Sequence, residues 1–235
     1  MRNYRLHLIR HGLTESNLRG QYAGRRTDTH LCQEGIRELI DLRESYEYPA
    51  VGLVFSSPLA RCIQTAGIVY PDRPLLVHNG LAEADFGEFD GKTGEELRDR
   101  ADFQQWVAQS STAPPPGGES AHEVMARAYG ALDAILRHMA DQEIFDAAIV
   151  THGGVISCIL SFMALPRLPV GDRMVGNGRG YTCYANPQLW QRDHILEVAG
   201  IMPHGADSAG GMSSQMLSEL QELADQGGFS LGDLT

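Results

Sequence analysis

The sequence lacks several features that would mark a specialised class of protein. No apolar run approaches the roughly 20 residues that a membrane-spanning helix needs. The chain opens directly into a strand-like run, with no apolar signal segment after a basic start. We therefore expect a cytoplasmic protein with no membrane partner. Its 19 basic residues are outnumbered by 30 acidic ones, and the formal net charge of −11 argues against nucleic acid as a partner.

Metal-binding and nucleotide-binding patterns are also missing. The four cysteines are scattered and form no CxxC pair, so neither a metal cage nor a disulfide framework is expected. There is no HExxH spacing and no Walker A sequence. The glycine-rich segment 176–180 precedes a predicted strand, which is the wrong order for a dinucleotide fingerprint and indicates a turn. We predict no metal and no cofactor.

The length and the pattern of the chain predict an α/β fold. At 235 residues, 43% of them hydrophobic, the chain can form one large domain with a substantial core. Strand-like and helix-like segments alternate with short connections, which predicts a three-layer sandwich: a mostly parallel sheet with helices on both faces. We expect this domain at 1–202, with a small helical lid at about 93–119 and a tail at 203–235.

The expected strands lie at 4–9, 51–55, 75–77, 147–150, 182–185 and 195–198, and the expected helices at 34–46, 58–70, 93–109, 120–139, 154–163 and 213–226. Ser57 followed by Pro58 predicts an N-cap and a first helical residue. Ser120 and Glu123 predict a capping box. For the tail helix we favour packing on the domain over contact with a second subunit or cover of the active-site mouth.

Five residues with complementary chemistry follow the ends of predicted strands. Arg10 and His11 follow the first strand, and Arg61 lies in the first turn of the helix after the second. Glu83 lies in the loop after the strand at 75–77, and His152 directly follows the strand at 147–150. Ligands bind beyond the carboxyl ends of the strands in an open α/β sheet, so parallel connections would bring all five to one rim.

This set of side chains suits phosphoryl transfer. The planar fork of arginine binds phosphate oxygens in pairs, and the N-termini of the helices after Ser57 and Gly154 would favour an anion at the same rim. A histidine among arginines resists protonation and is free to attack phosphorus. A carboxyl group that its surroundings keep protonated can give its proton to a departing alkoxide.

Each residue also has a plainer interpretation when taken alone. Arg61 could be a surface arginine, and Glu83 a solvated carboxylate. A single histidine is more often structural than catalytic. That interpretation is given to the remaining histidines, which are His7, His30, His78, His122, His138, His194 and His204. The order and the strand-end positions of the five residues favour the chemical interpretation.

Five segments of the chain resemble the histidine phosphatase superfamily, which includes the phosphoglycerate-mutase-like phosphatases. They occur in the family's order and cover the chain from about residue 4 to residue 200. The segments are LIRHGLTESN (8–17), SSPLARCIQTA (56–66), LAEADFGEFDGKT (81–93), PPGGES (115–120) and VTHGGVI (150–156).

The resemblance implies a role for each of the five residues. His11 would become phosphorylated, and Arg10, Arg61 and His152 would hold the phosphoryl group. Glu83, the first glutamate of its motif, would be the proton donor. The implied activity is that of a phosphomonoesterase, a metal-independent phosphatase that acts on a small phosphorylated metabolite. The alternatives are a phosphoglycerate mutase, whose family members carry a larger insertion between the motifs of Glu83 and His152, and a non-catalytic relative that binds phosphorylated ligands.

Other positions are candidates for substrate binding. Asn17 matches a position that often contacts the phosphate in this family, and Arg25, Arg26 and Lys92 lie near the predicted pocket. The segment 93–119 would arch over that pocket. A homodimer is possible.

One segment departs from the family's pattern. The stretch TDTHLCQEG (27–35) has His30 and Cys32 where relatives usually carry proline and a small hydroxyl residue. Both positions lie away from the five central residues, so we expect a change in local loop shape rather than in chemistry.

Overall fold

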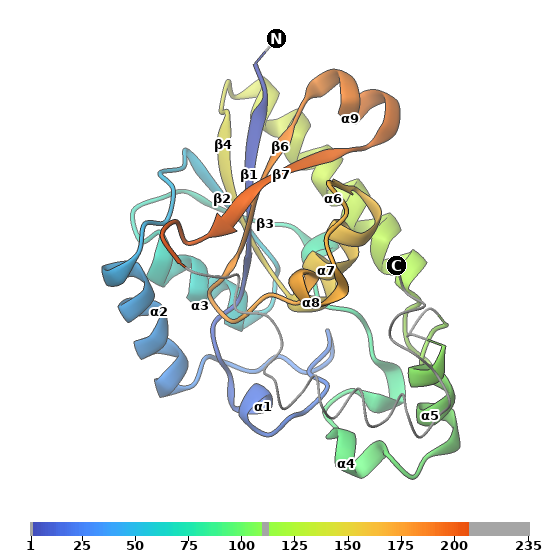
Figure 1. Ribbon diagram of the computed structural model, residues 1–235. Helices are drawn as coiled ribbons and strands as arrows, with labels where there is room; N and C mark the ends of the chain where they lie inside the picture. The colour runs from blue at the N-terminus through green and yellow to red at the C-terminus, as the bar shows by residue number, and fades with distance from the viewer. Residues whose placement is uncertain (1, 110–112, 207–235) are drawn as a thin grey trace.

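A seven-stranded sheet forms the centre of the protein (Figure 1). The structure is a computed structural model, and it describes residues 2–109 and 113–206. The strand order is β3-β2-β4-β1-β6-β7-β5, and β6 is the strand that runs antiparallel to both of its neighbours. The predicted α/β fold with a mostly parallel sheet is confirmed. The strands are β1 (Tyr4–Arg10), β2 (Leu53–Ser56), β3 (Leu75–Val77), β4 (Asp146–Thr151), β5 (Ala164–Leu165), β6 (Gly180–Ala185) and β7 (Leu196–Met202).

Helices cover both faces of this sheet, with α6 and α7 on one face and α2 and α3 on the other. The described helices are α1 (Glu15–Leu18), α2 (Gln33–Ser45), α3 (Ala60–Val69), α4 (Gly94–Leu97), α5 (Ala101–Ala108), α6 (Ala121–Asp141), α7 (Gly153–Phe162), α8 (Val170–Arg173) and α9 (Pro187–Asp193). Two short 3-10 helices, η1 (Asn79–Leu81) and η2 (Gly87–Phe89), flank the loop that carries Glu83.

The alternation of side chains along the central strands creates the two cores. Leu6 and Leu8 of β1 are fully buried in the cluster formed with α6 and α7, whereas Ile9 is buried on the opposite face with α2 and α3. Successive side chains of a strand point to opposite faces, so one strand supplies both layers. The first strand is therefore held from both sides up to the residue that precedes Arg10.

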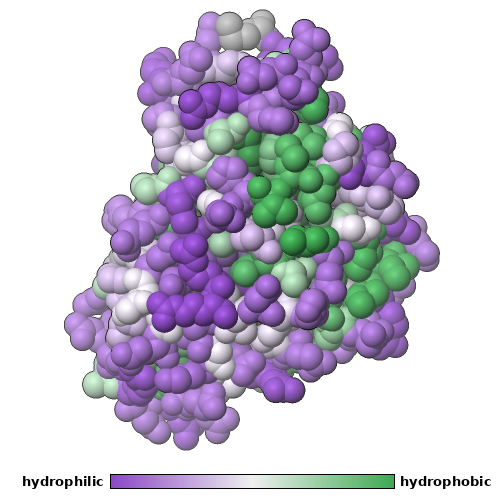
Figure 2. Space-filling model, turned by 180° about the vertical axis from the view of Figure 1, so that it is seen from behind, coloured by the Kyte–Doolittle hydropathy of each residue, from purple (hydrophilic) through white to green (hydrophobic). Residues whose placement is uncertain are grey.

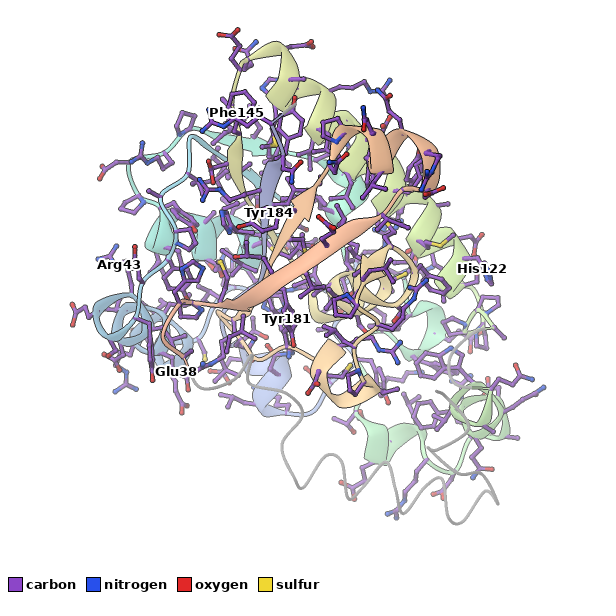
Figure 3. All side chains as sticks on the ribbon, turned by 45° about the horizontal axis from the view of Figure 1, so that its top comes forward. Glu38, Arg43, His122, Phe145, Tyr181 and Tyr184 are labelled. Atoms are coloured by element: carbon purple, nitrogen blue, oxygen red, sulfur yellow. The ribbon has the colours of Figure 1, made fainter. Side chains whose placement is uncertain are left out.

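The helices leave parts of the sheet uncovered. The edge strand β3 exposes Leu75 (37%), Leu76 (39%) and Val77 (51%), and the rear view shows apolar side chains gathered on that side of the molecule (Figure 2). On β6, Tyr181 is buried and Tyr184 is exposed; both side chains are labelled in Figure 3. The predicted cover on both faces therefore holds for the central strands and not for the edge.

A small separate core supports the predicted lid. Phe89, Leu97, Phe103 and Trp106 are buried together and pack against Tyr22. This cluster joins α4 and α5, which lie at the lower right of Figure 1, on the side of the molecule toward which β1 and β4 run.

The lid is not the single helix that was predicted at 93–109. Arg100 adopts an extended conformation (φ −81°, ψ 124°) that separates α4 from α5. Its guanidinium pairs with Asp102 and Glu88, which ties the break to the neighbouring loop.

The capping predictions had different outcomes. The capping box of Ser120 and Glu123 at the start of α6 is confirmed. The predicted N-cap at Ser57 is wrong, because α3 begins at Ala60 after Leu59, which makes no side-chain cap. The hydroxyl of Ser57 is instead 2.7 Å from Nε2 of His152. The predicted tail helix at 213–226 lies outside the described residues.

Gly180 permits the close approach of β6 to β1, and we expect Gly180→Ala to destabilise the protein. A Cβ atom at this position would lie 1.8 Å from the carbonyl oxygen of Leu8. Forcing the two strands apart should lower the free energy of unfolding by about 2 kcal/mol or more. Denaturant titration measures this change.

Gly130→Ala is the matched control, because Gly130 is exposed within α6 and a Cβ there meets nothing within 4 Å. Alanine is the better helix former, so this variant should gain about 1 kcal/mol. Equal effects of the two substitutions would show that the contact between β1 and β6 does not limit stability.

Candidate active site

The backbone of Arg10 and His11 is fixed where β1 ends. The N–H of His11 donates to the carbonyl of Thr151 on β4 (2.9 Å), and the side chain of Asn177 donates to the carbonyl of His11 (2.8 Å). The N–H of Gly178 donates to the carbonyl of Arg10 (3.0 Å), in a turn where Gly178 has a φ of 69° that suits glycine. The turn predicted at 176–180 is confirmed, and it braces both residues.

The ring of His11 is oriented by a backbone carbonyl. Its Nδ1 lies 2.7 Å from the oxygen of Gly12. A carbonyl can only accept, so Nδ1 carries the proton of the neutral ring and the lone pair is on Nε2. Burial, followed by the charges of Arg10 and Arg61, lowers the pKa of His11 well below 6.5. The neutral ring thus presents a free nitrogen.

Arg61 is fully buried and is held by the loop that precedes α2. Its guanidinium donates to the carbonyl oxygens of Thr27 (2.7 Å), Ala23 (3.2 Å) and Gly24 (3.2 Å). Arg10 donates from Nη1 to the carbonyl of Val175 (2.7 Å). Within the described residues, the buried Nε of each arginine has no hydrogen-bond partner. Each cation therefore keeps a donor that an anion can use.

His152 lies beside His11, with ring centroids 5.2 Å apart and planes at 60°. It is fully buried, and its Nε2 contacts the hydroxyl of Ser57 (2.7 Å) and the sulfur of Cys62 (3.4 Å). Burial, with the proximity of His11 and Arg61, lowers the pKa of His152 well below 6.5. Both histidines are therefore neutral at neutral pH.

Glu83 brings a buried carboxyl to the same cluster. The carboxyl accepts hydrogen bonds from the N–H groups of Ala84 (2.8 Å) and Gly154 (3.2 Å). Burial raises the pKa of Glu83 above 4.5, although these bonds and the charges of Arg61 and Arg10 favour ionisation. The close approach requires glycine at 154, since a Cβ there would lie 2.6 Å from Oε1 of Glu83.

The structure thus brings the five predicted residues together, but the two neighbouring helices contribute differently from the prediction. The N-termini of α3 and α7 were expected to face an anionic ligand. The N–H of Ala60 instead donates to Asp28 (2.7 Å), and that of Gly154 donates to Glu83. Carboxylates of the protein itself accept these helix-terminal amides.

The predicted substrate-binding residues lie outside this cluster of five. The side-chain oxygen of Asn17 accepts from Thr14 in the capping box of α1. Arg25 is exposed and pairs with Glu119 at 3.1 Å, and Lys92 is half-buried in the loop before α4. Their predicted contacts with a substrate remain predictions.

The departure at Cys32 has a local explanation. The sulfur of Cys32 accepts from the N–H of Gly35 at 3.3 Å and caps α2, which is the role that a hydroxyl would play. His30 is exposed. All four cysteines are free thiols.

Sequence reasoning missed two charged residues behind the site. Arg127 of α6 forms a bidentate ion pair with Glu119, both of its contacts being 3.0 Å long. Glu119 belongs to the PPGGES segment, which was one available signal. Arg127 offered another, because it stands between the apolar positions Val124 and Ala128 of its helix.

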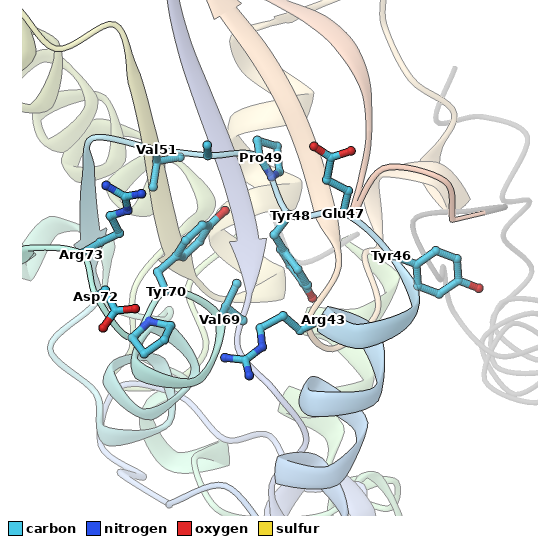
Figure 4. A pocket seen from close by; sticks show the side chains of 12 residues that line it. Arg43, Tyr46, Glu47, Tyr48, Pro49, Val51, Val69, Tyr70, Asp72 and Arg73 are labelled. Carbon is cyan, nitrogen blue, oxygen red and sulfur yellow. The ribbon is translucent and has the colours of Figure 1, made fainter.

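A separate hollow of about 410 Å³ lies between the end of α2 and the segment after α3 (Figure 4). Its lining carries charges of both signs, Arg43 and Arg73 against Glu47 and Asp72, and includes none of the five site residues.

The described residues contain no cluster of three or more His, Cys, Asp or Glu that could hold a metal ion. None of the described helices has both the length and the apolar character needed to cross a membrane.

Comparisons with known proteins agree with this geometry. Residues 6–178 match the family model of the histidine phosphatase superfamily, branch 1. The chain is 29% identical over 211 residues to the adenosylcobalamin/alpha-ribazole phosphatase of Escherichia coli K12, covering 87% of this chain and 100% of the relative. It is 30% identical over 165 residues to a 2,3-bisphosphoglycerate-dependent phosphoglycerate mutase of Methylobacterium sp. strain 4-46, covering 65% and 77%.

Solved structures share the fold. The alpha-ribazole phosphatase of Shigella flexneri superimposes with a TM-score of 0.66 at 24% identity, covering 89% of this chain and 99% of that one. A mycobacterial glucosyl-3-phosphoglycerate phosphatase superimposes with a TM-score of 0.67 at 24% identity, covering 84% and 97%.

The unpaired arginine donors predict an anion site that can be measured without turnover. Inorganic phosphate at about 100 times its Kd should stabilise the protein by about 3 kcal/mol. Arg10→Gln should abolish most of this gain. Thermal unfolding with and without phosphate, at ionic strength matched with sodium chloride, measures it.

Arg43→Gln is the control. Arg43 lies on α2, on the opposite side of the molecule from His122 at the start of α6 (Figure 3). Like Arg10, it holds one backbone carbonyl at 2.7 Å, that of Ile68. If Arg10→Gln and Arg43→Gln keep the same phosphate response, the anion does not bind at this cluster.

Proposed function

The chain belongs to the histidine phosphatase superfamily, branch 1, and on that premise we propose that it is a phosphomonoesterase that forms a phosphohistidine on His11. The observation that carries the proposal is the neutral, buried ring of His11 with its free Nε2, set beside Arg10 and Arg61. Phosphoryl transfer depends mainly on positioning and charge stabilisation, and this cluster offers both.

The first step of the proposed reaction transfers the phosphoryl group to the protein. The lone pair of His11 Nε2 forms a bond to phosphorus while the bond from phosphorus to the ester oxygen breaks. Glu83 gives its proton to the departing oxygen and becomes a carboxylate. Arg10 and Arg61 donate to the phosphoryl oxygens through the nitrogens that the backbone leaves free.

The second step returns the protein to its starting state. Water attacks phosphorus, the carboxylate of Glu83 takes a proton from that water, and the bond from phosphorus to Nε2 breaks. His152 contacts the same phosphoryl group and adds to its stabilisation, with its ring held by Ser57. Orthophosphate leaves, and no metal ion takes part in either step.

The buried carboxyl group of Glu83 is suited to act as an acid in the first step and as a base in the second. A general acid has to hold its proton until the leaving group needs it. Burial favours the protonated form of Glu83, whereas its two backbone hydrogen bonds and the arginine charges favour the ionised form that follows the first step. The opposing influences let the group act as an acid first and a base afterwards.

The substrate is a small phosphorylated molecule. The relatives named above act on different phosphate esters by their names, so the shared cluster explains the phosphoryl group and not the rest of the substrate. The exposed residues Arg25 and Arg26 and the half-buried Lys92 are our candidates for contacts with that remainder, and Asn17 for a contact with the phosphate.

His11→Ala should reduce phosphate release from an activated aryl phosphate by at least about 10³-fold, because the acceptor is lost. The unmodified protein should remain active in excess chelator, and acid-quenched turnover should show an acid-labile, base-stable phosphoryl group on His11. His122→Ala, which changes an exposed histidine of α6, is the control and should keep full activity.

Full activity in His11→Ala would refute the assignment of His11 as the nucleophile. Loss on chelation that a divalent ion restores refutes metal independence, and no turnover at all supports the non-catalytic alternative.

The mutase alternative requires a better-covered site. A mutase has to keep water from its phosphohistidine until a second substrate arrives. Among the described residues between η2 and α6, the helices are the two short ones α4 and α5, which pack with Phe89 in a small apolar cluster. We therefore expect hydrolysis to dominate. The test is incubation with 3-phosphoglycerate and a catalytic amount of 2,3-bisphosphoglycerate. Isomerisation that greatly exceeds phosphate release from every substrate tried would favour the mutase.

A further inference from the structure

Arg127 forms hydrogen bonds with the backbone of the loop that carries Glu83. From its half-buried place on α6, Nη1 donates to the carbonyl oxygens of Gly80 (3.0 Å) and Ala82 (2.6 Å), and Nη2 donates to that of Glu83 itself (3.0 Å). One planar group thus fixes three carbonyls within four consecutive residues.

Glu119 holds the backbone on the C-terminal side of Glu83. It forms the bidentate pair with Arg127, and its Oε2 also accepts from the N–H of Asp85 at 2.9 Å. Both side chains of the pair are only 17% exposed, so water weakens the interaction less than at a surface pair. Arg127 and Glu119 together hold the backbone from Gly80 to Asp85.

The loop needs such support because Glu83 belongs to no regular element. It lies between η1 and η2, and no strand ladder fixes its backbone. Its carboxyl accepts bonds from Ala84 and Gly154, so a shift of the loop would move the carboxyl relative to the end of α7. A misplacement of about 1 Å can cost roughly 10²-fold in rate.

We infer that Arg127 is a positioning residue for the proton donor, and that with Glu119 it holds the Glu83 carboxyl beside the phosphoryl site. This inference rests on the acid role proposed above for Glu83. Arg127 acts through the backbone of the loop and does not contact the substrate.

The test compares an alkyl phosphate, whose leaving group needs a proton, with nitrophenyl phosphate, whose leaving group needs little assistance. Arg127→Met should lower kcat/KM by about 10²-fold on the alkyl phosphate and by no more than about threefold on nitrophenyl phosphate. A general structural defect would lower both alike. Glu83→Gln should show the same selectivity, and the double variant should be no worse than Glu83→Gln on the alkyl phosphate.

Arg127→Lys separates geometry from charge, since Arg127 also contributes to the lowered pKa of His152. Lysine keeps the charge but has no fork to hold several carbonyls, so this variant should share the selective loss. Full activity in Arg127→Lys would mean that the charge of residue 127 alone matters and would overturn the inference.

Arg137→Met is the control on the same helix, because Arg137 pairs with Asp133 at the surface. It should behave as the unmodified protein.

The outcomes distinguish this inference from the proposed function. Equal losses in Glu83→Gln on both substrates would refute the acid role and the inference with it. Selective loss in Glu83→Gln with equal losses in Arg127→Met would refute the inference alone. If Arg127→Met does not fold, Glu119→Gln replaces it. That variant weakens the same pair and should show a smaller loss, again confined to the alkyl phosphate.

Discussion

Two guanidinium groups, those of Arg10 and Arg61, are buried at the rim of the sheet, and within the described residues neither forms an ion pair with a carboxylate. Arg61 is fully buried and Arg10 partly so, and both donate to backbone carbonyls. Carbonyl dipoles offset part of the cost of burying a cation while leaving its charge available to an anion. This arrangement sets the chemistry of the neighbouring groups, because the same two charges help to keep His11 neutral and oppose the protonation of Glu83. In the proposed reaction, the burial of Glu83 opposes these charges and favours the protonated form that a general acid needs.

The residues that hold the loop of Glu83 in place come from other parts of the chain than the five central residues. The five central residues lie at or just after the end of β1, on α3, in the loop after β3 and just after the end of β4. Arg25 and Arg26 are exposed and pair with Glu119 and Asp85, which flank Glu83 in space or in sequence. A substrate that contacts these arginines would act on the same loop that Arg127 holds. If Arg25 and Arg26 bind the substrate as we propose, its recognition and the placement of Glu83 involve the same hydrogen-bonded network.

Much of the fold and the central cluster could be predicted because their signals are local. A run of alternating or apolar residues predicts a strand, and the end of a parallel strand places Arg10, His11 and His152 at one rim. The errors arose where distant segments compete for a side chain. Ser57 has the local pattern of an N-cap, yet its hydroxyl contacts His152, 95 residues away. Arg127 looks like an ordinary helix residue, and its carbonyl partner Gly80 is 47 residues away. Neither contact leaves a spacing that can be seen in the sequence.

A carboxyl group of the protein accepts one backbone amide at the start of each of the helices α3 and α7. The N–H of Ala60 donates to Asp28 and that of Gly154 donates to Glu83, so these two amides are not free to bind an external anion. A helix-terminal amide would stabilise the phosphoryl group in every state, whereas at Glu83 it stabilises a charge that forms only when the acid has released its proton. In the proposed reaction, the hydrogen bond from the Gly154 amide to Glu83 would therefore favour the transition state over the bound substrate. The attraction for the phosphate group of the bound substrate would then come largely from Arg10 and Arg61, whose buried Nε groups have no partner within the described residues.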